Sequence, residues 1–117
     1  MATHDDLHRI ALALPGAEQH EGDPAYRVGG KQFVWTWRER VDPRRTKVPR
    51  PDVLVLCVPD EQDKAALVAA DPRVFFTEPH YDGHALVLVR LPEISVETLT
   101  EVVTDSWRCV APPTGDS

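Results

Sequence analysis

Residues 53–58, with the sequence Val-Leu-Val-Leu-Cys-Val, form an unbroken apolar run near the middle of a chain of 117 residues. A strand that is wet on one face alternates apolar and polar side chains, whereas a short continuous apolar run is typical of a strand covered on both faces. A second strand is predicted over residues 85–91, where Arg90 alone interrupts the apolar side chains. The chain is therefore expected to build a sheet with the first run at its centre.

Three helices are predicted around these strands. The first ends at Pro15-Gly16, begins near the helix-favouring acids Asp5 and Asp6, and has apolar residues at the spacing of one helix face: Leu7, Ile10, Ala11 and Leu14. The second covers residues 61–70, after Pro59-Asp60. The third is capped by Ser95 and carries an apolar stripe that includes Val96, Leu99, Val102, Val103 and Trp107.

A β-hairpin is predicted between the first and second helices. Gly29-Gly30 can adopt the positive φ angles of a two-residue turn, and residues 25–28 and 31–34 flank it as strands. In the second of these strands, Phe33, Trp35 and Trp37 alternate and are expected to share one face. We interpret that face as part of the core rather than as a set of base-stacking ligands.

With a short strand at residues 74–77, the predicted element order is α-β-β-β-α-β-β-α. This order predicts an α+β fold of two layers, with a largely antiparallel sheet and the helices on one face. Residues 1–112 are expected to form a single domain, and residues 113–117, after Pro112-Pro113, a frayed tail.

The sequence also bears on the compartment of the protein. It contains no apolar run of bilayer length, and its first residues have neither a basic region nor an apolar stretch typical of a signal peptide, so we expect a cytoplasmic protein. Cys57 and Cys109 are far apart in the chain, and we expect both to be reduced, buried and structural.

Charge is strongly segregated along the chain. Residues 27–50 hold eight of the thirteen Lys and Arg residues and two of the nineteen acids, so the segment carries +6 while the whole chain carries −6. Between residues 38 and 52 apolar side chains are scarce and three prolines occur, which predicts an exposed loop or extended wing. If the preceding hairpin and this loop form wings, seven cations could contact nucleic-acid phosphates: Lys31, Arg38, Arg40, Arg44, Arg45, Lys47 and Arg50. The alternative is a solvated loop beside an acidic body.

No catalytic or metal motif accompanies this charge. Four potential ligands alternate after the short strand, Glu78, His80, Asp82 and His84, but Pro79 and Gly83 interrupt the pattern and Asp82-Gly83 is a turn signal. Cys57 lies in the expected central strand, and neither serine of the third helix has a neighbouring base. We therefore expect no metal, no cofactor and no enzymatic activity.

A small cleft is a further possibility. The first helix and the loop at His80-Tyr81 could frame one together with Trp107, and His84 follows that loop closely. A cleft of this kind would make the protein a ligand-binding or protein-interaction module without chemistry.

Several short motifs, in this order and spacing, resemble the MmcQ/YjbR-like family of small bacterial proteins. They are Leu14-Pro15-Gly16, Lys31-Gln32-Phe33, the block at residues 75–83, the strand at residues 87–91 and Ser106-Trp107-Arg108. The resemblance spans about Leu7 to Pro112. It implies a CyaY-like or secretion-chaperone-like two-layer fold and a "double wing" mode of DNA binding.

Taken together, the residues and the resemblance predict a small non-enzymatic protein that binds the DNA backbone weakly. The contact would be the segment from Arg38 to Arg50, with no base code. The alternative is a ligand-binding or protein-interaction module whose partner the sequence does not specify.

Overall fold

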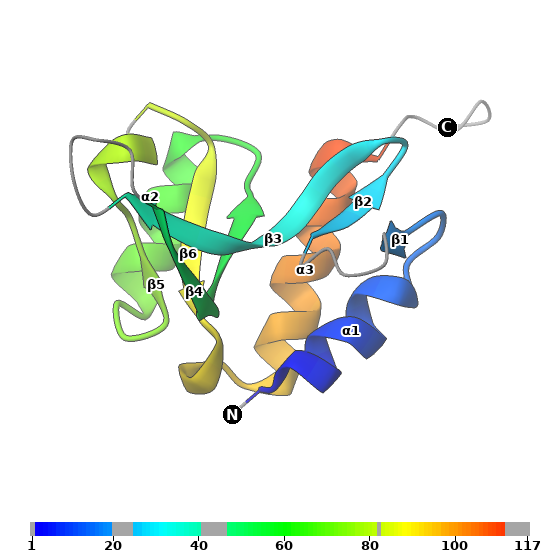
Figure 1. Ribbon diagram of the computed structural model, residues 1–117. Helices are drawn as coiled ribbons and strands as arrows, with labels where there is room; N and C mark the ends of the chain where they lie inside the picture. The colour runs from blue at the N-terminus through cyan, green and yellow to red at the C-terminus, as the bar shows by residue number, and fades with distance from the viewer. Residues whose placement is uncertain (1, 20–24, 41–46, 82, 112–117) are drawn as a thin grey trace.

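The computed structural model describes residues 2–19, 25–40, 47–81 and 83–111 (Figure 1). Its helices are α1 (His4–Leu12), α2 (Glu61–Ala70) and α3 (Val96–Val110), with short 3-10 helices η1 (Pro79–Tyr81) and η2 (Leu91–Glu93). Its strands are β1 (Glu18–Gln19), β2 (Tyr26–Val28), β3 (Lys31–Arg40), β4 (Lys47–Cys57), β5 (Phe75–Phe76) and β6 (Leu86–Arg90). The predicted order of elements is confirmed, and the two-residue β1 is added to it. The predicted tail at 113–117 lies outside the described residues.

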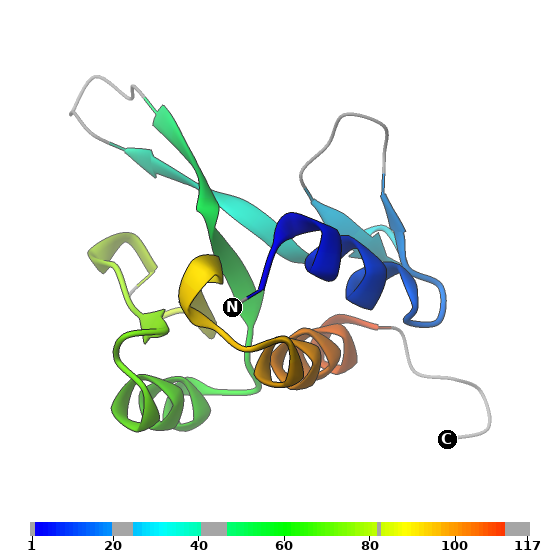
Figure 2. The same cartoon turned by 90° about the horizontal axis from the view of Figure 1, so that it is seen from below.

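The strands form one antiparallel sheet in the order β1-β2-β3-β4-β6-β5. β4 pairs with β3 on one side and β6 on the other, as its continuous apolar run predicts. All three α-helices pack against the core on the same side of the sheet (Figure 2). The α+β prediction, with a largely antiparallel sheet and helices on one face, is confirmed.

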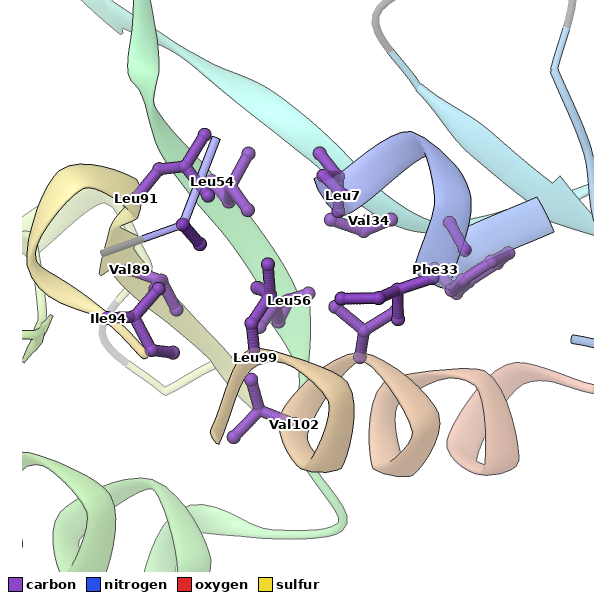
Figure 3. Packing of buried hydrophobic residues seen from close by; sticks show 14 of the residues in the cluster. Leu7, Phe33, Val34, Leu54, Leu56, Val89, Leu91, Ile94, Leu99 and Val102 are labelled. Atoms are coloured by element: carbon purple, nitrogen blue, oxygen red, sulfur yellow. The ribbon is translucent and has the colours of Figure 1, made fainter. Parts of the chain in front are cut away.

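The core lies between the sheet and these helices (Figure 3). Leu54 and Leu56 point into it from β4, and Leu7 and Leu99 meet them from α1 and α3. Val34 from β3 completes this layer. All five side chains are at least 98% removed from solvent, and burial of apolar side chains of this kind stabilises the fold.

β3 and β4 form a hairpin that extends into the segment predicted as an exposed loop or extended wing. Arg40 pairs with Lys47, so the described residues 38–40 and 47–52 are extended strand, and the loop alternative is wrong for them. β6 pairs only with Val53–Cys57 of β4, and the outer half of β4 therefore belongs to a two-stranded ribbon. A strand of such a ribbon tolerates Pro49 and Pro51, because their missing N–H groups need no second neighbour.

A β-bulge explains why both Phe33 and Val34 are fully buried. Tyr26 pairs with Val34 and Arg27 with Gln32, which leaves Phe33 as an extra residue in β3. Two consecutive residues at a bulge can turn their side chains to the same side of the sheet. Phe33 thereby joins the core beside Val34.

Trp35 and Trp37 lie on the opposite face of the sheet, so the prediction of a single Phe33-Trp35-Trp37 core face is wrong beyond Phe33. Trp35 pairs with Val55, which alternates with the core residues Leu54 and Leu56. Both tryptophans are only partly buried. The bulge at Phe33 interrupts the alternation from which the common face was predicted.

A small aromatic cluster, defined as Trp35, Trp37, Phe76 and Tyr81, covers this outer face. The Trp37 and Phe76 rings meet edge to face with centroids 6.0 Å apart. Burial raises the pKa of the Tyr81 hydroxyl, and the neighbouring Trp35 side chain partly opposes this increase. The guanidinium carbon of Arg90 stands 4.0 Å from the Phe76 centroid. Leu88, which pairs with both Val55 and Phe76, is completely buried. The outer face is thus a second packed layer, held mainly by rings.

A capping box starts α1 and yields a testable prediction. The Thr3 hydroxyl accepts from the Asp6 N–H at 3.2 Å, and the Asp6 carboxylate accepts from the Thr3 N–H at 3.0 Å. This bonding lowers the pKa of Asp6, chiefly through the Thr3 N–H. We expect Thr3→Ala to lower the free energy of unfolding by about 1 kcal/mol in urea denaturation. Thr100→Ala on exposed α3 surface is the control, and equal effects of the two changes would contradict a role for the box.

Candidate nucleic-acid interface and ligand groove

The basic wing, defined as the β3–β4 hairpin from Arg38 to Arg50, extends beyond the helices (Figure 2). Arg38 and Arg50 are exposed. Arg38 pairs with Pro49, and Arg50 pairs with Trp37 at the start of the outer aromatic cluster. Arg40 and Lys47 are paired through their backbones near the tip, and Arg44 and Arg45 lie outside the described residues. The hairpin geometry therefore gathers predicted phosphate contacts on a projecting element.

Lys31 does not belong to this wing. It is exposed at the opposite end of β3, beside the Gly29-Gly30 turn, whose φ angles of 60° and 82° confirm the predicted hairpin. Arg38 lies seven positions after Lys31 along the strand, which corresponds to about 23 Å. Lys31 and the wing would have to meet different parts of an extended ligand.

The base of the wing is tied to α1. The His4 ring nitrogen Nε2 lies 2.5 Å from the Pro51 carbonyl oxygen, close to the point where β4 leaves the three-stranded part of the sheet. This contact links the N-terminal end of α1 to the strand that carries Lys47 and Arg50. It helps to set the direction of the hairpin relative to the helical layer.

The predicted cleft residues lie in two different places. The Trp107 indole N–H donates to the Pro15 carbonyl at 3.0 Å, which fixes Trp107 beside the end of α1. Tyr81 and His84 lie on the α2 side, where the Lys64 ammonium donates to both of their carbonyl oxygens. The backbone of His80 is part of η1, and its side chain is outside what the structure describes. The described contacts thus place Trp107 and this loop beside different helices, and the predicted cleft stays a prediction.

A groove of about 620 Å³ lies instead between α2 and α3, at the end of β4. Apolar side chains dominate its lining, with five polar or thiol groups among them: Leu56, Cys57, Val58, Pro59, Asp63, Ala66, Leu67, Val87, Val102, Asp105, Arg108 and Cys109. α2 is rich in alanine, and only Leu67 and Val68 are larger apolar residues. Small side chains leave space against α3, which explains the groove physically.

The groove is not predicted from the sequence, because two helices distant in the chain form it. The prediction that both cysteines are buried is wrong for Cys109, which is exposed at the groove, while Cys57 is partly buried. Both thiols are free. The alanine content of residues 65–70 is the signal in the sequence that points to the groove, because alanine side chains are too small to fill the space between two helices.

Neither thiol is activated as a nucleophile. Burial raises the pKa of the Cys57 thiol, against a smaller opposing effect of Ser106. Burial also raises the pKa of Cys109, and Cys57, Asp105 and Asp63 add to the increase. Both groups are therefore protonated at neutral pH, the less reactive form of cysteine.

The alternating block after β5 provides no metal centre within the described residues. No group of three or more His, Cys, Asp or Glu side chains in that part of the chain could hold an ion. Asp82 and the His80 side chain lie outside it. The expected absence of a metal therefore stays a prediction.

A match to a protein-family model shows which family this chain belongs to. The sequence model of the YjbR family matches residues 12–109. This protein belongs to the YjbR family. The match extends from the end of α1 to the last turn of α3 and includes the whole basic wing and both walls of the groove.

The similar proteins place this YjbR-family chain among bacterial sequences. Uncharacterized proteins of Mycobacterium tuberculosis strain H37Rv and of Mycobacterium bovis are each 43% identical to it over 119 residues, covering 96% of this chain and 91% of theirs. The crystal structure of Deinococcus radiodurans protein DR2400, described as a DUF419 domain, is 22% identical with a TM-score of 0.63. The match covers 92% of this chain and 77% of that one, and it supports the fold. No helix in the described parts of the chain is long and apolar enough to cross a membrane.

Proposed function

We propose that this protein binds DNA through backbone phosphates, with the basic wing as the contact. The observation that carries the proposal is that residues 38–50, with six cations and two acids and hence a charge of +4, belong to a hairpin that projects from the body (Figure 2). Arg38 and Arg50 are exposed on that hairpin. A projecting ribbon of cations can approach a phosphate backbone while the acidic body stays at a distance.

The same charge distribution limits the affinity. The whole protein carries −6, so its body repels a polyanion and only the wing attracts one. Arginine and lysine contacts to phosphates carry no sequence information. We therefore propose weak, salt-sensitive binding without base recognition, by a protein that performs no chemistry on the nucleic acid.

The test compares two variants of equal charge. Arg38→Gln with Arg50→Gln removes two cations from the wing, and Arg9→Gln with Arg108→Gln removes two from α1 and α3. We expect the wing variant to bind a labelled duplex about tenfold more weakly than the native protein at low salt. Each lost phosphate contact should also reduce the slope of log affinity against log salt concentration by about 1. Fluorescence anisotropy at several salt concentrations measures both the affinity and this slope.

Arg9 and Arg108 make a suitable control because each is exposed and joined to a carboxylate three residues away on its own helix. Their removal changes the total charge by the same amount as the wing variant. Equal weakening by both variants would show that net charge alone, rather than the wing, governs binding. That result would overturn the assignment of the contact.

The second candidate function is that of a ligand-binding module, and the groove between α2 and α3 favours it. Its volume of about 620 Å³ falls within the range of small-molecule sites, and its lining is mainly apolar with a few polar groups. This candidate does not require the basic wing. Variants of the wing and of the groove therefore separate the two functions.

A further inference from the structure

The groove between α2 and α3 combines an apolar floor with charge at one wall. Leu56 and Val87 from the sheet and Val102 from α3 line the floor. Ala66 and Leu67 supply the α2 wall. A hydrocarbon or aromatic body placed there would exchange water for apolar contacts on several sides.

Carboxylates gather at the Cys109 end of the groove. Asp63 from α2 and Asp105 from α3 both line the groove, and both lie near enough to Cys109 to raise the pKa of its thiol. Arg108 is the only cation among the lining residues and bonds Asp105 at 3.2 Å. The lining therefore carries a net charge of −1, and among the residues that the structure describes no cation lies within ion-pair distance of Asp63.

We infer that the groove binds a hydrophobic organic cation, with its apolar body on the Leu56–Val102 floor and its ammonium group beside Asp63. An apolar floor below an uncompensated carboxylate is complementary in both shape and charge to such a molecule. An amphipathic anion would bind less favourably. The Arg108 guanidinium is already paired with Asp105, and the Asp63 carboxylate would repel the anion. The inference rests on the second of the two proposed functions and is independent of DNA binding.

The test uses two probes of equal chain length and opposite charge, octylammonium and octanoate. We expect octylammonium to bind with a dissociation constant in the millimolar range, as its small number of atoms allows, and octanoate to bind at least about fivefold more weakly. Two-dimensional NMR titration of the full chain would locate the site through the amides of Ala66, Leu67 and Val102. Alkylation of the exposed Cys109 thiol by iodoacetamide should slow when octylammonium is bound.

Three variants assign the contacts. Asp63→Asn should weaken octylammonium about fivefold, the size of one exposed ion pair, while Glu97→Gln, in the first turn of α3 outside the groove, should leave it unchanged. Ala66→Phe fills the groove from an exposed helix position and should abolish binding without unfolding the protein. Octanoate binding as tightly as octylammonium, or no shift of the groove amides, would overturn the inference.

These outcomes are distinct from those of the DNA experiment. Ala66→Phe should leave duplex binding unchanged, and the Arg38 and Arg50 variant should leave octylammonium binding unchanged. Loss of both activities in either variant would contradict the separation of the two surfaces.

Discussion

Replacing Ser106 by alanine is expected to lower the free energy of unfolding by about 3 kcal/mol. The Ser106 hydroxyl accepts from the Cys57 N–H at 2.8 Å and donates to the Phe33 carbonyl oxygen. Ser106 and Phe33 are both 0% exposed and Cys57 is partly buried, so both backbone groups would lose their partner where water is scarce. Each buried group left unsatisfied costs about 1–3 kcal/mol, which makes the effect large for the loss of one oxygen atom.

The position of this hydroxyl explains why it matters to the fold. Phe33 is the extra residue of the β-bulge, and Cys57 is the last residue of β4. Ser106 therefore joins α3 to two strands at the points where their regular pairing ends. Chemical denaturation of Ser106→Ala against Thr100→Ala, an exposed hydroxyl of the same helix, measures the effect. A loss no larger than that of Thr100→Ala would show that the two bonds contribute nothing to stability.

Replacing Lys64 by methionine is expected to cost about 2 kcal/mol and to loosen the segment around η1. Lys64 is only 4% exposed, and its ammonium group donates to the carbonyl oxygens of Tyr81 at 2.9 Å and His84 at 3.0 Å. Methionine matches the length of the side chain and removes both donors. The two carbonyls, which come from one short loop, would lose the group that holds them to α2.

Hydrogen exchange distinguishes this local role from general destabilisation. Amides of residues 80, 81 and 83–86 should exchange faster in Lys64→Met, while those of β3 and α3 should change only in proportion to global stability. Lys31→Met, at an exposed lysine, is the matched control. Uniform acceleration over the whole chain would contradict an anchoring role for Lys64.

Local signals in the sequence predict the fold well where one residue decides the geometry. Gly29-Gly30 predicts the turn, Ser95 predicts the start of α3, and its hydroxyl does accept from the Thr98 N–H. The apolar run at residues 53–58 predicts the central strand. Each of these features depends on neighbours in the chain, so alternation and capping rules apply to it directly.

Features that depend on distant contacts could not be predicted in the same way. The bulge at Phe33 arises from pairing with β2, and it moves Trp35 and Trp37 to the outer face. The groove arises from the distance between α2 and α3, which small side chains of α2 leave unfilled. The charge of the wing was visible in the sequence, whereas its extent as a two-stranded ribbon depends on the point where β6 stops pairing.

The salt dependence of DNA binding by the native protein tests the central claim most directly. A labelled duplex titrated at about 50 mM and about 200 mM salt should show saturable binding that weakens about 40-fold, the change expected for roughly three phosphate contacts. That result would agree with a basic wing that meets the DNA backbone. The absence of saturable binding at about 50 mM salt, or an affinity that does not change with salt, would contradict the account.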